Sequence, residues 1–308
     1  MKQLITLFLV LQCFVVMLPF IPVAEAAEQE LMPVIQADDL KVQLQNYFID
    51  HEISEDLVSV GYIYTATGES WYYHPDQWYY SASLYKVPLM MLYAEKEAEG
   101  ELNQETEFFN MPLSEIEDEV LTFSNNSIAY SMMLTLAQPD ACRRMFQRYA
   151  SLPEEYYSWD FYASSYFSAR FMTEVMNTLY SEPDRFPGIA ERLMEAQPGH
   201  YFRLKLDETG VSVAQKYGNY HDEEGYDWNH TTGIIYTEHP FILTVMTRYG
   251  GISETIISDL AQLFYEYTLQ AEQRILLLQK EAENEGFFPG EPSLSGSSEC
   301  LWLFSRMT

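Results

Sequence analysis

The stretch Tyr79–Met91, YYSASLYKVPLMM, combines a serine, a lysine and an apolar helical pattern. Ser83 and Lys86 stand in the order S-x-x-K where the chain enters a helix predicted for Leu84–Ala98. Residues i and i+3 share one helix face, so the two side chains can touch, and the unpaired N–H groups of the first turn can hold an anionic oxygen. Burial would favour a neutral lysine amine, which can take a proton from a hydroxyl. The pattern fits an activated serine nucleophile, although taken alone it is more typical of a capping serine followed by a solvated lysine.

The composition is that of a globular and strongly acidic chain. Of the 308 residues, 47% are hydrophobic, which is enough for a sizeable core. Lys and Arg number 17 against 46 Asp and Glu, so the formal net charge is −29. Such a charge argues against partners such as nucleic acid or anionic lipid, and it favours a soluble monomer.

The N-terminus has the pattern of a targeting segment. Lys2 precedes an apolar run, Leu4–Phe20, and Ala24-Glu25-Ala26 fits a small-x-small cleavage site. We therefore expect residues 1–26 to be a signal peptide and the mature protein to be secreted and extracellular. The alternative is an uncleaved leader that anchors the protein at the cell surface, because the apolar run is nearly long enough to span a membrane.

Hydrophobic periodicity divides the rest of the chain into a helical block between two groups of strands. Before the block, it predicts a helix at Asp38–Ile53 and strands at Leu57–Thr67 and Ser70–His74. The block holds helices at Leu121–Ala137, Ala141–Ala150, Ser168–Leu179 and Ile189–Ala196, and a loop at Pro153–Asp160. Strands follow at Val211–Gln215, Thr232–Thr237 and Phe241–Thr247, with an acidic loop at His221–Asp227 and a last helix at Ile252–Gln279. We expect a domain at 27–280, with a sheet lobe (38–82 and 199–280), a helical lobe (83–198) and a flexible tail from 281 to 308.

Two further motifs follow the serine. Ser124-Asn125-Asn126 lies within the helical block, where it would also serve as a helix cap. Lys216-Tyr217-Gly218 comes at the end of the first strand after the block, and Gly218 would let a substrate backbone approach closely. Each motif alone also has an ordinary structural explanation.

Taken together in this order, the three motifs resemble those of the penicillin-recognising serine hydrolases, and most closely the class A β-lactamase-like family. The likeness covers most of residues 38–278, including Tyr201–Gly218 and Asp227–Thr247. It implies an α/β (α+β) fold of the β-lactamase/transpeptidase type. In that fold an antiparallel sheet is flanked by the N- and C-terminal helices and carries an inserted all-helical lobe.

The resemblance also implies roles for the motif residues. Ser83 would be the acylated nucleophile, and Lys86 would help to deprotonate it. Ser124 would relay the proton to the leaving nitrogen, while Asn126 would hold the substrate amide and the Lys86 amine. Lys216 would supply positive potential near Ser124 and the substrate carboxylate.

The substrate-binding edge would be formed by the third motif. The backbone N–H groups of Ser83 and Asn219 would form the oxyanion hole beside Gly218. At Tyr217 the sequence departs from the family, whose members carry a serine or threonine there that binds the substrate carboxylate. A phenol cannot occupy the same place.

A second departure lies in the loop after Ala150. Class A enzymes carry a glutamate there, in an E-x-x-x-N pattern, which activates the water that hydrolyses the acyl-enzyme. Here Glu154, Glu155 or Asp160 could substitute, or they could be ordinary solvated carboxylates. Without that base, we expect acylation to proceed and hydrolysis of the acyl-enzyme to be slow.

The sequence therefore predicts an exported serine hydrolase that acts on a β-lactam or a related amide, with small-molecule β-lactams or peptidoglycan-like peptides as partners. The alternatives are a D-alanyl-D-alanine peptidase, another amidase or esterase, and a non-catalytic penicillin-binding sensor. No cofactor is expected, and no metal motif stands out among the 6 histidines. Cys142 and Cys300 could pair after export, but their spacing does not demand it.

Overall fold

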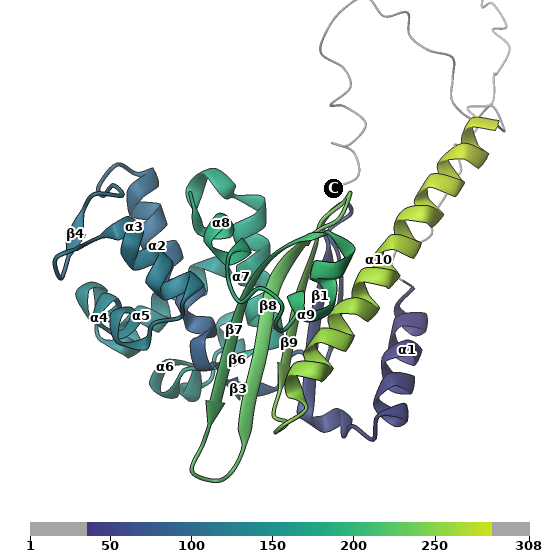
Figure 1. Ribbon diagram of the computed structural model, residues 1–308, viewed down its shortest axis with the longest axis horizontal. Coiled ribbons are helices and arrows are strands. Elements are labelled where there is room, and N and C mark those ends of the chain that lie inside the picture. Colours follow the sequence, from purple (N-terminus) through teal and green to yellow (C-terminus); the bar gives the residue numbers. More distant parts are fainter. Residues whose placement is uncertain (1–35, 285–308) are drawn as a thin grey trace, which may run out of the picture. The chain divides into compact units, whose positions relative to one another are not determined.

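The computed structural model describes residues 36–284 as a sheet with helices on both faces (Figure 1). The predicted leader, Cys300 and the predicted tail from residue 285 onward lie outside the described residues. Within residues 36–284, no helix is both long enough and apolar enough to cross a membrane.

The main sheet has five strands in the order β2-β1-β9-β8-β7, and adjacent strands are antiparallel. Its members are β1 Val58–Tyr64, β2 Glu69–Tyr73, β7 Ser212–His221, β8 Asp227–Tyr236 and β9 Phe241–Thr247. Every residue of β1 and β9 is buried, because both faces of these central strands are covered. β7 is an edge strand, and its last residues are exposed.

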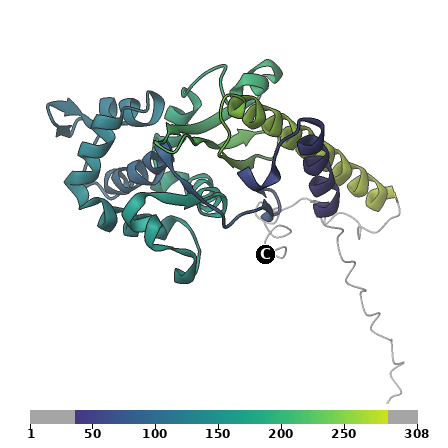
Figure 2. The same ribbon diagram turned by 90° about the horizontal axis from the view of Figure 1, so that it is seen from below.

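The two faces of the sheet carry different helices (Figures 1 and 2). α1 Ala37–Asp50, α9 Arg203–Leu206 and α10 Ser253–Asn284 cover one face, where Tyr62 packs against Phe241 and Phe264. The other face meets α7 Ala169–Ser181 and the helical block. The remaining helices are α2 Lys86–Ala98, α3 Leu113–Glu117, α4 Asn126–Leu136, α5 Pro139–Phe146, α6 Trp159–Ser164 and α8 Ile189–Met194. This arrangement confirms the predicted fold class.

Two short strand pairs complete the described structure. β3 Trp78–Tyr80 pairs with β6 Tyr166–Ser168, and β4 Glu107–Phe108 pairs with β5 Met111–Pro112. The first pair is important for the site, because β3 leads directly into the Ser83 turn.

Several predicted boundaries were wrong, and each error has a local cause. The helix predicted at Leu121–Ala137 is interrupted, because a π turn at Asp118–Thr122 ends before α4 starts at Asn126. The expected loop at Pro153–Asp160 contains a 3-10 turn at Glu154–Tyr156 and the start of α6.

The strand boundaries near Lys216 were also wrong. β7 does not end at Gln215 but runs on to His221, and β8 starts at Asp227 rather than at Thr232. Their polar residues lie in a hairpin that extends beyond the core, so hydrophobic alternation could not reveal it. Similarly, α10 continues to Asn284, past the expected start of the tail at residue 281.

Candidate active site

Ser83 lies in a tight turn at the entrance to α2, as the sequence predicted. A 3-10 turn at Ala82–Tyr85 leads into the helix, which begins at Lys86. Ala82 has a φ of 45°, a left-handed conformation that costs free energy for a residue with a side chain. The Ser83 side chain remains partly exposed between buried neighbours. The turn therefore presents one accessible hydroxyl at the start of a buried helix.

Lys86 is fully buried, and its amine is the centre of a polar cluster. Its Nζ donates to the Ser124 carbonyl at 2.6 Å and to Asn126 Oδ1 at 2.6 Å, and it lies 3.0 Å from Ser124 Oγ. Burial lowers the pKa of Lys86 from 10.5 to about 8. The amine can therefore lose its proton close to neutral pH.

In the Ser124-Asn125-Asn126 motif, Asn125 caps a helix, whereas Ser124 and Asn126 contact Lys86. Asn125 caps α4, since its Oδ1 accepts from Ser127 N at 3.0 Å and from Ile128 N at 3.2 Å. The cap leaves Ser124 and Asn126 free to face Lys86. Ser124 has a φ of 59°, the second left-handed backbone at the site.

Lys216 reaches the same serine from the sheet. It lies in the middle of β7, where its side chain is fully buried and its Nζ lies 2.9 Å from Ser124 Oγ. Burial and the nearby Lys86 amine hold the pKa of Lys216 well below its ordinary value. Two lysines thus converge on one hydroxyl, and within residues 36–284 neither of them forms an ion pair with a carboxylate.

Gly218 brings the edge strand against the nucleophile turn. A Cβ added at Gly218 would lie 2.8 Å from Ser83 N and 3.1 Å from Ser81 O, so only glycine allows this approach. Asn219 follows on the exposed end of the strand. The predicted oxyanion donors, the N–H groups of Ser83 and Asn219, therefore come from two segments in direct contact.

One predicted contact is not formed. No hydrogen bond joins the Ser83 hydroxyl to Lys86 in the part of the chain that the structure describes. Without a bound substrate, hydrogen bonds between catalytic groups are often long, so the missing bond does not exclude Lys86 as the partner of Ser83. The two residues are still one turn apart at the entrance to α2.

Comparison with known proteins identifies the family of this chain. The family model described as the beta-lactamase enzyme family matches residues 39–268. The chain belongs to this family. No curated protein matches it in sequence.

Solved structures of β-lactamases and of PBP-A share the fold at low sequence identity. The extended-spectrum β-lactamase TLA-1 has a TM-score of 0.63 and 15% identity, covering 75% of this chain and 99% of its own. A β-lactamase from Chitinophaga pinensis DSM 2588 has a TM-score of 0.62 and 13% identity, with 75% and 99% covered. PBP-A has a TM-score of 0.61 and 13% identity, with 75% and 96% covered.

In this β-lactamase-family chain, the segment after Ala150 contacts Ser81, two residues before the nucleophile. The backbone carbonyl of Ser165 accepts from Ser81 N at 2.8 Å, and the two side-chain hydroxyl oxygens also lie 2.8 Å apart. By contrast, the candidate carboxylates of this segment, Glu154, Glu155 and Asp160, are all exposed. None of the three has a hydrogen bond or ion pair to Ser83, Lys86 or Lys216 within the described residues.

His230, which the sequence did not single out, contacts the strand that leads into the Ser83 turn. It is fully buried in β8, opposite Gly218, and its Nε2 lies 2.9 Å from Tyr80 O while Nδ1 accepts from Thr247 N at 3.2 Å. Burial lowers the pKa of His230 to about 4, so the ring is neutral near pH 7. A single histidine in a strand gave no signal of this role.

Proposed function

We propose that the protein is an exported serine hydrolase that forms an acyl-enzyme on Ser83 with a β-lactam or a related amide. The observation that carries this proposal is the convergence of the Lys86 and Lys216 amines on Ser124 Oγ, at 3.0 and 2.9 Å. Two buried amines without carboxylate partners are costly to maintain, and a proton relay to a bound substrate gives them a use.

The network suggests the path of the proton. Neutral Lys86 takes the Ser83 proton as the serine oxygen attacks the substrate carbonyl. Ser124, bonded to both lysines, passes a proton to the leaving nitrogen and is reprotonated from Lys86. The bond from Ser83 Oγ to the acyl carbon forms, the carbon–nitrogen bond breaks, and the nitrogen leaves with one proton.

The oxyanion hole gives a direct prediction at Gly218. Replacing Gly218 by Ala is expected to slow acylation of Ser83 about 100-fold, because the new Cβ would push β7 away from the Ser83 N–H. Acylation rates from intact mass spectrometry measure this. The matched control is Asn219→Ala, which removes a neighbouring side chain but keeps the backbone N–H. Equal rates for Gly218→Ala and the control would contradict the assignment.

Hydrolysis of the acyl-enzyme is expected to be slow, because the carboxylates after Ala150 are exposed and make no contact with the site lysines. A chromogenic cephalosporin tests this. We expect a burst of about one equivalent, followed by slower turnover. Steady turnover without a burst would indicate that another group activates the deacylating water.

A D-alanyl-D-alanine peptidase or a related amidase or esterase is the second candidate. The exposed carboxylates favour this candidate, since they do not suit rapid hydrolysis of penicillins, and Tyr217 favours the amidases and esterases within it. Release of D-alanine from a peptide ending in D-alanyl-D-alanine would support this candidate. If Ser83 cannot be acylated by any probe, the protein is instead a non-catalytic binding module.

Export is part of the proposal and depends on residues 1–26. The substrates named above occur at or beyond the cell surface, and the leader pattern fits that location. N-terminal sequencing of the native protein tests it. A start near Ala27 supports secretion, whereas an intact leader in the membrane fraction supports a surface anchor.

A further inference from the structure

The phenol ring of Tyr217 covers the amine of Lys216. The Lys216 Nζ lies 4.2 Å from the ring centroid, and the whole lysine side chain is buried. Neighbouring residues of a strand point to opposite faces, so these two side chains can meet only round the open edge of β7. The ring thus occupies the side of the amine that faces this edge.

Tyr217 is held in place by a second ring. Tyr201 stacks on it with the centroids 5.0 Å apart and the planes at 15°. Asn219 Nδ2 lies 3.4 Å from the Tyr201 hydroxyl, which connects the pair to the end of β7. Tyr201 has a φ of 55°, an unusual conformation for a bulky residue, so its surroundings must fix it there.

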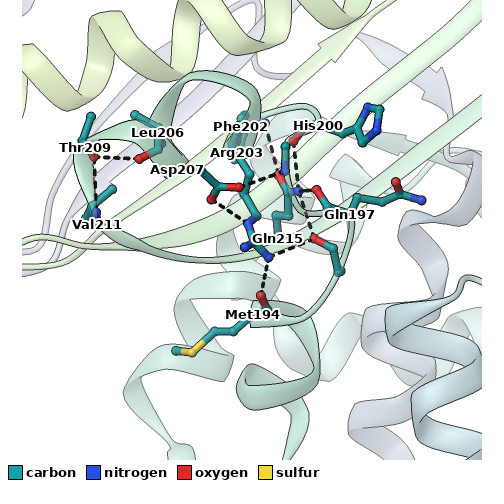
Figure 3. A network of polar contacts seen from close by, with 12 residues as sticks. Met194, Gln197, His200, Phe202, Arg203, Leu206, Asp207, Thr209, Val211 and Gln215 are labelled. Carbon is teal, nitrogen blue, oxygen red and sulfur yellow. Dashed lines mark hydrogen bonds and ion pairs between the residues drawn. The ribbon is translucent and has the colours of Figure 1, made fainter.

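Those surroundings are a polar network centred on Gln215 (Figure 3). Its Oε1 accepts from Phe202 N at 3.1 Å, and its Nε2 lies 3.2 Å from the carbonyl oxygens of Ala196, Gln197 and His200. Gln215 is fully buried. The segment that carries Tyr201 is therefore anchored to β7, two residues before Tyr217 in the chain.

The Lys216 amine is the group at this edge that suits an anion. Within residues 36–284 it forms no ion pair with a carboxylate, and the Tyr217 ring lies over it. If the ring were absent, the amine would face the open edge of β7 and could bind a carboxylate.

We propose that Tyr217 makes this enzyme select acyl donors whose leaving group carries no carboxylate. The ring blocks the Lys216 amine from an anion and gives the leaving group an uncharged surface instead. Esters and internal amides fit this surface, while a free carboxylate beside the scissile nitrogen gains no charged partner there. The inference rests on the proposed acylation of Ser83 and narrows its substrate class.

Benzylpenicillin and its methyl ester test the proposal, because they differ only in the carboxylate. Acylation of Ser83 in the full-length protein is followed by intact mass for both compounds. We expect the wild type to react with the ester at least as fast as with the acid. In Tyr217→Ser, the acid should gain about 10- to 100-fold relative to the ester, because the freed Lys216 amine can bind its carboxylate.

The matched control is Tyr217→Phe, which keeps the ring and should keep the wild-type ratio. The ratio is measured within one protein, so a general loss of stability does not change it. An acid preference above about tenfold in the wild type, an unchanged ratio in Tyr217→Ser, or a Phe variant that behaves like the Ser variant would each overturn the proposal.

A second probe pair separates this inference from the proposed function. If neither penicillin reacts, 3-acetoxybenzoic acid and its methyl ester provide the same comparison with a more reactive acyl group, and the same criteria apply. If the aryl esters label Ser83 with a preference for the acid, the inference fails and the proposed function stands. If no probe labels Ser83, the proposed function itself fails, and this inference with it.

Discussion

Lys86→Met is expected to slow acylation of Ser83 by about 10³-fold, because it removes the proposed general base. Methionine fills a similar buried volume, so the helix should remain intact. The rate of mass gain with an acylating probe measures the effect. Lys96→Met is the matched control: the same change on the same helix, at an exposed lysine paired with Glu101. A loss below about tenfold in Lys86→Met would rule out Lys86 as the base.

The wild-type pH profile provides a second measure of the same role. The pKa of Lys86 is lowered to about 8, and only the neutral amine can accept the serine proton. Acylation should therefore rise about tenfold per pH unit below pH 8 and level off above it. The rise should be absent in Lys86→Met. A wild-type rate that is flat from pH 6 to 9 would contradict a lysine base.

Arg192→Met is expected to destabilise the fold, by about 1 kcal/mol more at pH 9 than at pH 6. Arg192 pairs with the fully buried Glu117 at 2.8 Å and with Asp118 at 3.0 Å. Glu117 ends α3, and Asp118 starts the π turn that precedes Ser124. Removing the guanidinium leaves the Glu117 carboxylate buried without its counter-ion.

The stability loss of Arg192→Met should grow with rising pH, because the pKa of Glu117 is raised. Burial raises the pKa of Glu117 to about 8, although Arg192 opposes the shift. A raised folded pKa means that stability falls with rising pH until the folded pKa is passed. Without Arg192 that pKa is higher still, so the variant keeps losing stability above pH 8, where the wild type does not.

Urea unfolding at pH 6 and pH 9 measures the free energy of unfolding of the wild type and the variant. Lys96→Met, which breaks the exposed Lys96–Glu101 pair, is the control and is expected to lose less than about 1 kcal/mol. At pH 6 the Arg192→Met loss should be smaller, because protonated Glu117 needs no counter-ion. A loss that is equal at both pH values would show that Glu117 does not respond to Arg192.

The motif residues could be predicted from the sequence because their chemistry is local. Ser83 and Lys86 follow from helix spacing, and the capping preference of Asn125 explains how Ser124 and Asn126 are presented. The convergence of Lys86 and Lys216 came from the family resemblance, since no local rule connects residues so far apart in the chain.

The supporting residues could not be predicted, because they act through tertiary contacts. His230 touches the chain before Ser83 only after β8 and β3 are assembled. In the sequence, Tyr217 is only a departure from the serine or threonine of the family motif. The stack on Tyr201 shows where its ring lies. The extended hairpin of β7 and β8 was hidden for a related reason: its polar strands are stabilised by pairing rather than by burial.

The most direct test of the account is intact mass against time after adding a penicillin ester or acid, for the wild type and Ser83→Ala. We predict a mass gain of one acyl group in the wild type only, lasting for hours, since no described carboxylate forms a hydrogen bond or ion pair with the site lysines. Labelling of Ser83→Ala to the same extent, or no labelling of the wild type by any acyl donor, would contradict Ser83 as the nucleophile.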